Sequence, residues 1–558
     1  MEIKMTAIPG GKKGKVGKIG VSTGDKVNAG DVLVQVEISK GNKPIRASEE
    51  GIITKILCRE GDEVCANQIL FELEQVCRAA SSEEPVQNCG EQEELKTQLL
   101  VIGGGPGGYV AAICAAKKGL SVTLVEKEAL GGTCLNVGCI PTKALVKSSE
   151  ICRNVRESAV FGILTQDGPR VDMEQIIRRK DDVKNNLVSG INTLLEHNGI
   201  RFIQGEASFI SLNKVSVKGE KSYVISARDI IVATGSKCSK VKIPGIDLPP
   251  VMNSTDALSC TELPGTVTIV GGGVIGMEFA FLYHNLGVKV HIVEFLDRLL
   301  GMMDSEVSQS IQDIARSNGI GVSLKSKVLK IQQAEGGQAI VTYADTNGEH
   351  TLVSDKVLVA IGREPRLDGL NIEKAGVALN ERGRGITVDA HMRTNVEHIY
   401  AIGDVTNLIQ LAHVASRQGM TAVENILGNP VQMDYSAVPN VVFTSPEIAG
   451  VGLTQEDCRK REIDCSVSTV AYASNGKAMT MNETEGFIKL VRDNSTRKIV
   501  GGSIIGADAS SLISTLTLAI ANGMTDVDVA KTIFTHPTTA EIIHEAALGF
   551  GMGAIHQI

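Results

Sequence analysis

Tryptophan is absent from this 558-residue sequence, and aromatic residues make up only 3% of it. Hydrophobic cores must therefore be built from valine, isoleucine, leucine and alanine, and the 43% hydrophobic content is enough for several cores. No apolar run is long enough to span a bilayer, and the N-terminal MEIKMTAIPG lacks an apolar signal core. We therefore expect a cytoplasmic protein of several domains, since a domain usually takes about 100–200 residues.

Positive charge is not in excess either, because the formal net charge is −8. This disfavours a nucleic-acid partner, which would require clustered lysine and arginine. Twelve cysteines are too few for a disulfide scaffold in a chain of this length. In a reducing compartment, a closely spaced cysteine pair is more typical of a catalytic or metal site.

The first part of the sequence, residues 1–76, contains an internal repeat. GDKVNAGDVLVQVE (24–37) is echoed by GDEVCANQILFELE (61–74), and each copy reads as a turn followed by an alternating strand. Two such halves predict a small β-sandwich or flattened barrel with approximate twofold symmetry. Lys40 lies between the halves, at or near an expected exposed hairpin tip. One interpretation is an ordinary solvated lysine.

The other interpretation of Lys40 comes from a resemblance. The segment resembles a lipoyl domain, in which the lysine at the hairpin tip between symmetric halves carries lipoate; here that tip reads Glu37-Ile38-Ser39-Lys40-Gly41. The resemblance implies covalent lipoate on Lys40. Residues 77–96, CRAASSEEPVQNCGEQEELK, are polar and acidic, which indicates a flexible linker that would let the lysine swing.

A dinucleotide-binding fingerprint follows the linker. A predicted strand (Gln98–Ile102) leads into Gly103-x-Gly105-x-x-Gly108, a helix, and a second strand that ends at Glu126. The glycines permit a tight turn and close approach of a pyrophosphate to the helix N-terminus, and the acid suits the ribose hydroxyls. An ordinary strand–helix turn is the alternative, and the complete strand, helix and acid disfavour it.

The same fingerprint occurs a second time, as Gly271-x-Gly273-x-x-Gly276 with Glu294. The chain therefore carries two predicted dinucleotide units. A carboxylate at Glu294 should bind a ribose diol and repel a 2′-phosphate, so the second unit is expected to prefer NAD to NADP.

Two cysteines, Cys134 and Cys139, stand close together in GGTCLNVGCIPTK (131–143), just after the first unit. Buried thiols at a helix start are one interpretation. A zinc site is another, although no second cysteine or histidine pair follows at finger spacing. A redox disulfide is the third, because two Cβ atoms about 3.5–4.5 Å apart can be reached across a loop that bends into a helix.

With this stretch, DIIVATGS (229–236) and TNVEHIYAIGDV (394–405), the sequence from about Leu99 onward resembles the pyridine-nucleotide disulfide oxidoreductases. The resemblance implies that Cys134 and Cys139 form the redox-active disulfide, with Cys134 facing substrate and Cys139 against the flavin. It also implies that Lys143 lies near the flavin ring and pairs with Glu278.

Near the C-terminus, TIFTHPTTAEIIHEAA (532–547) resembles the segment that carries the catalytic His–Glu dyad of this family. The resemblance implies that His536 exchanges protons with thiols, that Glu541 orients the imidazole, and that the dyad acts across a homodimer interface. Members that oxidise dihydrolipoamide usually have a second histidine where this chain has Phe534, so we expect altered packing there. His544 is assigned no role.

FAD and NAD are the cofactors that the resemblance implies, and no metal is expected. The residues expected to bind them are Gly103, Gly105, Gly108, Glu126, Thr133, Lys143, Ala207, Thr234, Gly235, Ser236, Asp404, Leu411, Ala412, His413, Gly271, Gly273, Gly276, Glu294, Val328 and Gly362.

The other ten cysteines show no comparable pairing in the sequence. Cys58 and Cys65 are the exception kept open, as a metal or redox pair. The remaining ones are Cys77, Cys89, Cys114, Cys152, Cys238, Cys260, Cys458 and Cys465.

The expected fold class is α/β, with two Rossmann-like dinucleotide-binding domains and an α+β dimerisation domain behind a small all-β domain. The expected boundaries are 1–76 lipoyl-like, 77–96 linker, 97–248 FAD-binding, 249–376 NAD-binding, 377–437 central and 438–558 dimer interface. In the last domain, EGFIKLVRD and IVGGSIIG are predicted strands, with helices from about Ser510.

A lipoyl-like segment fused to such a core implies oxidation of protein-bound dihydrolipoyl groups, with electrons passing through the disulfide and FAD to NAD⁺. The implied partners are a second copy of the chain, lipoyl-bearing subunits of a 2-oxo acid, acetoin or glycine-cleavage complex, and lipoate ligase. Two alternatives stay open. One is a glutathione-type or other small-thiol reductase with an unmodified docking domain; the other is a non-enzymatic assembly protein.

Overall fold

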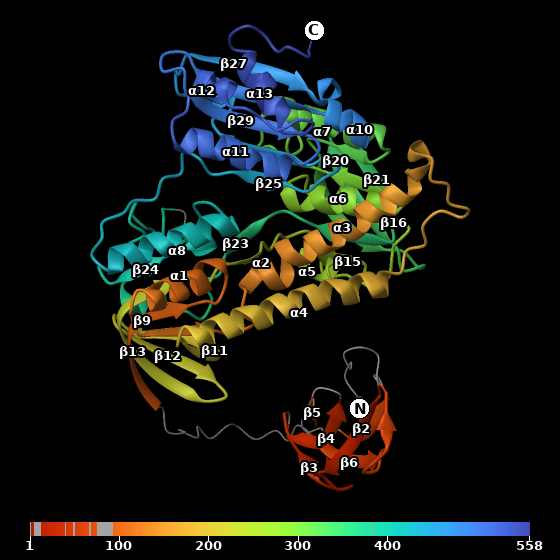
Figure 1. The fold of residues 1–558 in the computed structure, drawn as a ribbon, viewed down its shortest axis with the longest axis vertical. Helices are drawn as coiled ribbons and strands as arrows, with labels where there is room; N and C mark the ends of the chain where they lie inside the picture. The colour runs from red at the N-terminus through yellow and green to blue at the C-terminus, as the bar shows by residue number, and fades with distance from the viewer. Residues whose placement is uncertain are drawn as a thin grey trace. The chain divides into compact units, whose positions relative to one another are not determined.

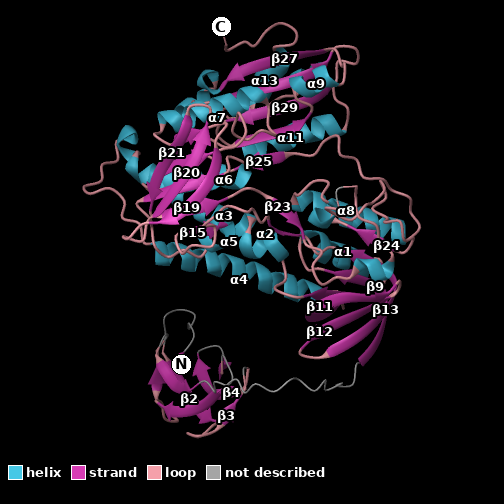
Figure 2. Ribbon diagram, turned by 180° about the vertical axis from the view of Figure 1, so that it is seen from behind, coloured by secondary structure: helices cyan, strands magenta, loops and turns pink. Residues whose placement is uncertain are grey.

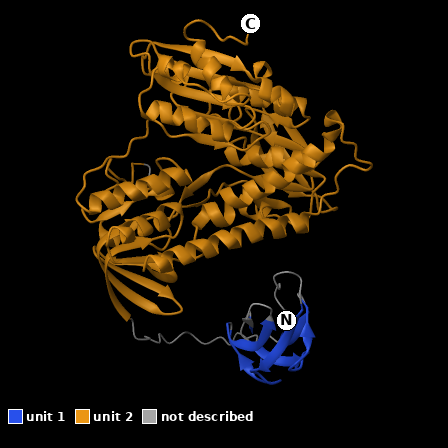
Figure 3. Ribbon diagram, in the orientation of Figure 1, with its two compact units in different colours: residues 1–89 blue, residues 90–558 orange. Residues whose placement is uncertain are grey.

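The protein is described by a computed structural model over residues 2–4, 13–28, 30–38, 41–47, 51–65, 68–74, 93–381 and 383–557. The chain divides into two compact units, residues 1–89 and 90–558 (Figure 3). Within the described residues, no helix combines the length and the hydropathy that a transmembrane span would need.

The first unit consists of two four-stranded antiparallel sheets, with strand orders β1-β8-β6-β3 and β5-β4-β2-β7. Residues 14–38 and 51–74 supply equivalent strands, so the approximate twofold repeat predicted from the sequence is confirmed. Leu33, Ile53, Leu70 and Phe71 form its core with no exposed surface. The strands are β1 (Glu2–Lys4), β2 (Gly14–Ile19), β3 (Lys26–Val27), β4 (Val32–Ile38), β5 (Gly41–Arg46), β6 (Gly51–Ile56), β7 (Glu63–Val64) and β8 (Ile69–Glu74).

Strands β4 and β5 pair with each other in antiparallel register, ending at Ile38 and Gly41. Lys40, which separates them in the sequence, lies outside the described residues, as do residues 77–92 of the predicted linker. The thiol of Cys58 is buried and donates to Leu70 O at 3.8 Å, while Cys65 is exposed.

The second unit begins with a six-stranded sheet of order β12-β11-β10-β9-β13-β24, whose central strands are parallel (Figure 1). Its strands are β9 (Glu93–Ile102), β10 (Val122–Glu126), β11 (Arg201–Ser211), β12 (Lys214–Gly219), β13 (Ser222–Val232) and β24 (Ile399–Ala401). Helices α1 (Pro106–Lys117), α4 (Met173–His197) and α8 (Ala412–Ile426) pack on one face around Leu99, Val101 and Leu195.

The start of this sheet's first strand differs from the sequence expectation. β9 begins at Glu93, within the predicted linker 77–96, because the strand pairs with β13 from the Glu93–Tyr223 position onward. The predicted central segment, 377–437, contributes β24 to the edge of this sheet and α8 to its helical layer.

A second, all-parallel sheet has the order β15-β22-β16-β17-β18. Its strands are β15 (Val251–Asn253), β16 (Thr266–Val270), β17 (Lys289–Val293), β18 (Gly321–Ser323) and β22 (Lys356–Val359), with helices α5 (Ser254–Ala257), α6 (Val274–Asn285) and α7 (Ser305–Ser317). An antiparallel sheet of β19 (Lys327–Gln333), β20 (Ala339–Asp345) and β21 (Gly348–Ser354) adjoins it. Strands β14 (Ser236–Cys238) and β23 (Arg363–Pro365) pair where the chain passes between the two parallel sheets.

The C-terminal part is an antiparallel sheet of order β25-β26-β29-β28-β27, which helices cover (Figure 2). Its strands are β25 (Asn440–Val442), β26 (Ile448–Gly452), β27 (Cys465–Ala471), β28 (Phe487–Asp493) and β29 (Ile499–Ile505); its helices are α9 (Gln455–Lys460), α10 (Gly476–Met481), α11 (Ala509–Ala521), α12 (Asp526–Lys531) and α13 (Glu541–Leu548). The buried Lys489 ties this sheet to α7 through Asp304 and Glu306, at 3.1 and 3.0 Å.

The predicted fold class is confirmed: two parallel α/β layers and an antiparallel α+β domain follow a small all-β unit. The predicted strands EGFIKLVRD and IVGGSIIG are β28 and β29, and the helix expected from about Ser510 is α11. The short 3₁₀ helices are η1 (Ser158–Phe161), η2 (Ile372–Ala375), η3 (Gly403–Thr406) and η4 (Tyr472–Ser474).

Candidate active site

A cavity of about 1650 Å³ lies in the second unit and is lined by both glycine turns, both acids that follow them, and both cysteines. The sequence-predicted residues that line it are Gly105, Glu126, Thr133, Cys134, Cys139, Lys143, Thr234, Gly235, Ser236, Gly271, Gly273, Glu278, Glu294, Val328, Gly362, Asp404, Leu411, Ala412 and His413. The cavity therefore brings a thiol pair together with both glycine turns.

The first glycine turn joins β9 to α1. Gly103 has a φ of +110°, and a Cβ on Gly108 would lie 1.8 Å from Gly103 O, so neither position tolerates a side chain. Gly103 and Gly108 form the turn without lining the cavity, whereas Gly105 lines it. Glu126 accepts hydrogen bonds from Gly104 N and Glu128 N, each at 2.7 Å, which fixes its carboxylate beside the turn.

The second turn, between β16 and α6, repeats this arrangement. Gly271 also has a φ of +110°, and a Cβ on Gly276 would lie 1.9 Å from Gly271 O. Glu294 accepts from Gly272 N and, at 2.6 Å, from Leu296 N, and its side chain lines the cavity. Each carboxylate keeps lone pairs that ribose hydroxyls could use, and a 2′-phosphate near Glu294 would meet its negative charge.

The residues present fit two dinucleotides. Gly105 and Gly273 are the N-caps of α1 and α6, and neither helix has a side-chain cap, so the N–H groups of their first turns have no side-chain acceptor. A pyrophosphate would satisfy these donors and interact favourably with the helix dipole. A Cβ added at Gly273 would meet no atom within 4 Å, so the space in front of the N-terminus of α6 is open.

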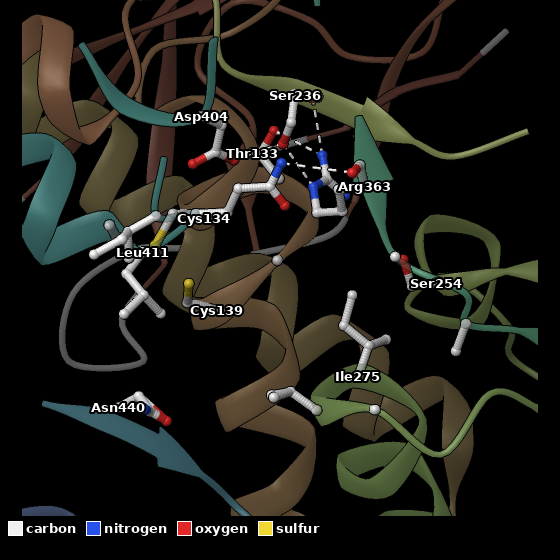
Figure 4. A pocket seen from close by; sticks show the side chains of 18 of the residues that line it. Thr133, Cys134, Cys139, Ser236, Ser254, Ile275, Arg363, Asp404, Leu411 and Asn440 are labelled. Carbon is white, nitrogen blue, oxygen red and sulfur yellow. Dashed lines mark hydrogen bonds between the residues drawn. The ribbon is translucent and has the colours of Figure 1, made fainter. Parts of the chain in front are cut away.

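The two cysteines occupy a break between helices. Cys134 lies in α2 (Gly132–Val137), and Cys139 is the first residue of α3 (Cys139–Arg156), with Gly138 between the helices. Both are free thiols, and their side chains hydrogen bond with each other. Figure 4 shows the two sulfur atoms in the cavity wall.

The pKa values of the two thiols are shifted in opposite directions. The hydrogen bond from Cys134 lowers the pKa of Cys139 to about 7, against the effect of burial and with help from the positive charge of Lys143. The start of α3 adds the favourable end of a helix dipole. The same hydrogen bond, together with burial, raises the pKa of Cys134. In the dithiol state Cys139 is therefore the first of the two thiols to ionise.

Lys143 is held beside this pair by a carboxylate from the second parallel domain. Its Nζ lies 2.7 and 2.9 Å from the two oxygens of Glu278, which is buried in α6, and 4.4 Å from the centre of the Phe443 ring. The ion pair thus links α3 to α6 and fixes a positive charge near Cys139.

Replacing Lys143 with methionine is expected to raise the pKa of Cys139, because the lysine charge favours the thiolate. Alkylation of Cys139 by iodoacetamide, followed by peptide mapping across pH, should then begin at higher pH than in the parent protein. Lys147→Met, which removes an exposed lysine from the same helix, serves as the control. An unchanged pH midpoint in Lys143→Met would refute the electrostatic role of Lys143.

A polar network lies on the other side of Cys134 (Figure 4). Ser236 donates to Asp404 at 2.5 Å, and Arg363 donates to Ser236 at 2.8 Å and to Thr133 at 3.2 Å. Burial raises the pKa of Asp404, and the hydrogen bond from Ser236 opposes that effect. Arg363 was missed in the sequence; its only signal was a basic residue directly after Gly362.

Ala207 lies differently from the other predicted cofactor-binding residues, whereas Leu411 and His413 lie at the cavity. Ala207 is buried in β11 and is not among the cavity-lining residues. Leu411 is the N-cap of α8, and His413 in the first turn contacts Pro439 O through Nε2 at 2.9 Å; both residues line the cavity.

His536 and Glu541 form the expected pair, with Nδ1 and Oε1 2.9 Å apart. Glu541 also accepts from Thr538 N at 2.9 Å, and these contacts lower its pKa despite burial. The His536 side chain is 79% exposed, and neither residue lines the cavity that contains Cys134. Within one chain, the dyad and the thiol pair are therefore not brought together.

Phe534 packs against His544, with ring centroids 5.6 Å apart, and His544 Nε2 contacts Ala530 O at 3.0 Å. Cys458 and Cys465, for which the sequence shows no pairing, lie close enough for Cys465 to contribute to raising the pKa of Cys458. Their contact depends on how α9 returns to β27, which spacing alone does not reveal.

Residues 97–419 match the family described as pyridine nucleotide-disulphide oxidoreductase, 438–547 match its dimerisation domain, and 2–73 match the family described as biotin-requiring enzyme. A dihydrolipoyl dehydrogenase of Haloferax volcanii is 41% identical over 83% of this chain and 98% of its own length. One of Chlamydia trachomatis is 42% identical over 80% and 96%. The crystal structure of LpdA from Mycobacterium tuberculosis superposes with a TM-score of 0.76 at 27% identity, covering 81% of this chain and 99% of that one.

Proposed function

The chain belongs to the pyridine nucleotide-disulphide oxidoreductase family, and from that premise we propose that it oxidises protein-bound dihydrolipoyl groups with NAD⁺, as a dihydrolipoyl dehydrogenase. The identity of about 40% to dihydrolipoyl dehydrogenases over most of the chain, together with the lipoyl-type first unit, favours this reading over a glutathione-type reductase.

The observation that carries the proposal is the single cavity that joins Cys134 and Cys139 to both glycine turns. A disulfide reductase without a nicotinamide cofactor would need only one such turn. FAD at the first turn would supply two-electron chemistry between the thiols and a hydride acceptor, and NAD⁺ at the second would be that acceptor. Glu126 and Glu294 would hold the two riboses.

The proposed thiol steps use the chain's own residues. His536 accepts a proton from one dihydrolipoyl thiol, and the resulting thiolate attacks Cys134 of the Cys134–Cys139 disulfide, which breaks the protein S–S bond. The second lipoyl thiol then closes the lipoyl disulfide and releases Cys134 as a thiol. Cys139 is left as the thiolate, which its pKa of about 7 favours near neutral pH.

We infer that the working unit is a homodimer. Residues 438–547 match a dimerisation domain, and the exposed His536 is separate from Cys134 within one chain. A second copy that presents its His536 to this cavity would complete the site. The free thiols among the described cysteines suit a reducing compartment, and we place the protein in the cytoplasm.

Lys40 is proposed as the lipoyl attachment site, modified by lipoate ligase, so that the first unit carries substrate to this active site or exchanges it with lipoyl-bearing subunits of a 2-oxo acid, acetoin or glycine-cleavage complex. Tethering could raise the local lipoyl concentration toward the millimolar range, if the linker spans the distance.

The purified protein is expected to reduce NAD⁺ with dihydrolipoamide at least about tenfold faster than NADP⁺, because Glu294 disfavours a 2′-phosphate. NAD(P)H-dependent reduction of oxidised glutathione should be negligible.

Intact mass of protein from lipoate-replete cells should show a lipoyl group that Lys40→Arg removes. Lys40→Arg should keep its full rate on free dihydrolipoamide. Preference for glutathione would overturn the substrate assignment, and an unmodified mass would overturn the carrier role.

A further inference from the structure

A second pair of thiols lies in the C-terminal antiparallel domain, where Figure 2 shows α9 beside β27. Cys458 belongs to α9, and Cys465 is the first residue of β27. The two residues lie on adjacent elements, with Cys465 two positions past a backbone bond from Ile463 N to Cys458 O, and Cys465 contributes to the raised pKa of Cys458. This pair is not needed for the proposed reaction.

The backbone fixes this contact. Thr454 caps α9 through a reciprocal pair of bonds with Asp457, and the helix ends at Lys460. The chain then reverses through Glu462, which has a φ of +57°, and Ile463 N donates to Cys458 O at 2.9 Å. Cys465 is held next in the ladder with β28, opposite Asp493. The turn therefore returns Cys465 past Cys458.

The two thiols differ in access to solvent. Cys458 has no exposed surface, whereas Cys465 is partly exposed. Burial and the contact with Cys465 raise the pKa of Cys458 to about 12, which keeps it protonated. Thiol exchange requires one accessible sulfur that attacks and one shielded sulfur that resolves, and this pair has both.

We propose that Cys458 and Cys465 form a second oxidisable dithiol, whose oxidant is a low-molecular-weight disulfide. The Cys465 thiolate attacks one sulfur of that disulfide, whose S–S bond breaks and releases one thiolate, leaving a mixed disulfide on Cys465. Cys458 then loses its proton and attacks the Cys465 sulfur, which expels the second thiol. Two electrons pass from the protein to the reagent, and the products are one protein disulfide and two small thiols.

The pair also borders the main cavity. Asp457 and Arg461, next to Cys458 and three residues beyond it, line that cavity, and Glu456 pairs with Arg298 at 3.3 Å. Oxidation would therefore link α9 covalently to β27 at the edge of the cavity that holds the second nucleotide turn.

The test uses the full-length, FAD-bound protein, incubated anaerobically with oxidised glutathione, acid-quenched, alkylated with iodoacetamide and digested with trypsin. Arg459, Lys460 and Arg461 separate the two cysteines, so trypsin cuts between them and a Cys458–Cys465 disulfide appears as two cross-linked peptides. We expect this species to accumulate with oxidant and to be lost on reduction.

Cys465→Ser replaces the accessible thiol and should leave Cys458 fully alkylated without a cross-link. The control is Cys260→Ser, which replaces another partly exposed cysteine and should leave the cross-link unchanged. Full alkylation of both Cys458 and Cys465 in the denatured quench, under conditions that oxidise Cys134 and Cys139 completely, would overturn the proposal. Glutathione retained on Cys465 without a cross-link would overturn it equally.

Discussion

Cys134→Ser is expected to lower dihydrolipoamide-dependent NADH formation by at least about 10³-fold, because a hydroxyl cannot form the disulfide through which electrons enter. Cys134 faces the cavity beside Cys139, so the substitution removes one of only two sulfurs in the proposed exchange. Steady-state NADH formation gives the rate, and FAD content and Tm show whether the variant still folds and binds flavin.

Cys260→Ser is the matched control. Its thiol is part-exposed, donates to Glu262 O at 3.3 Å and does not line the cavity, so its rate should match that of the parent protein. A Cys134→Ser protein that binds FAD and keeps more than about a tenth of the parent rate would be incompatible with a disulfide relay.

The second large effect concerns the partner subunit. His536→Ala alone should lower the rate by about 10²–10⁴-fold, the range expected for loss of a general acid–base group. The decisive form of the experiment co-expresses a Cys134→Ser chain and a His536→Ala chain with different affinity tags and isolates the mixed dimer by two successive purifications.

If each site takes Cys134 from one chain and His536 from the other, one of the two sites in the mixed dimer is intact, and the rate per dimer should be about half that of the parent. Parent dimers purified with the same two tags supply the reference. If both residues served the same chain, neither site would be intact and the mixed dimer would be as inactive as its parents.

The two glycine turns could be predicted from the local sequence. Gly103 and Gly271 are required by their own positive φ, and Gly108 and Gly276 by the carbonyl oxygens of Gly103 and Gly271, so the spacing of the motif predicts the geometry found. The same holds for the repeat of the first unit, where alternating strands fix the paired sheets.

Long-range packing explains what the sequence did not reveal. β9 starts at Glu93 because β13 pairs with it, although the residues before Thr97 read as linker. Arg363 reaches Thr133 and Ser236 only after the two parallel domains meet. Cys458 and Cys465 meet because α9 is short and turns through a left-handed residue, which a list of cysteine positions does not encode.

The central claim is that electrons from the substrate enter through Cys134 and Cys139. The most direct measurement reduces the FAD-bound protein, alkylates it with iodoacetamide, maps the label by peptide mass, and follows dihydrolipoamide-dependent NADH formation on the same samples. The rate should fall in proportion to label at Cys134 or Cys139, whatever the label at Cys458 and Cys465. Full labelling of the first pair with an unchanged rate would contradict the account.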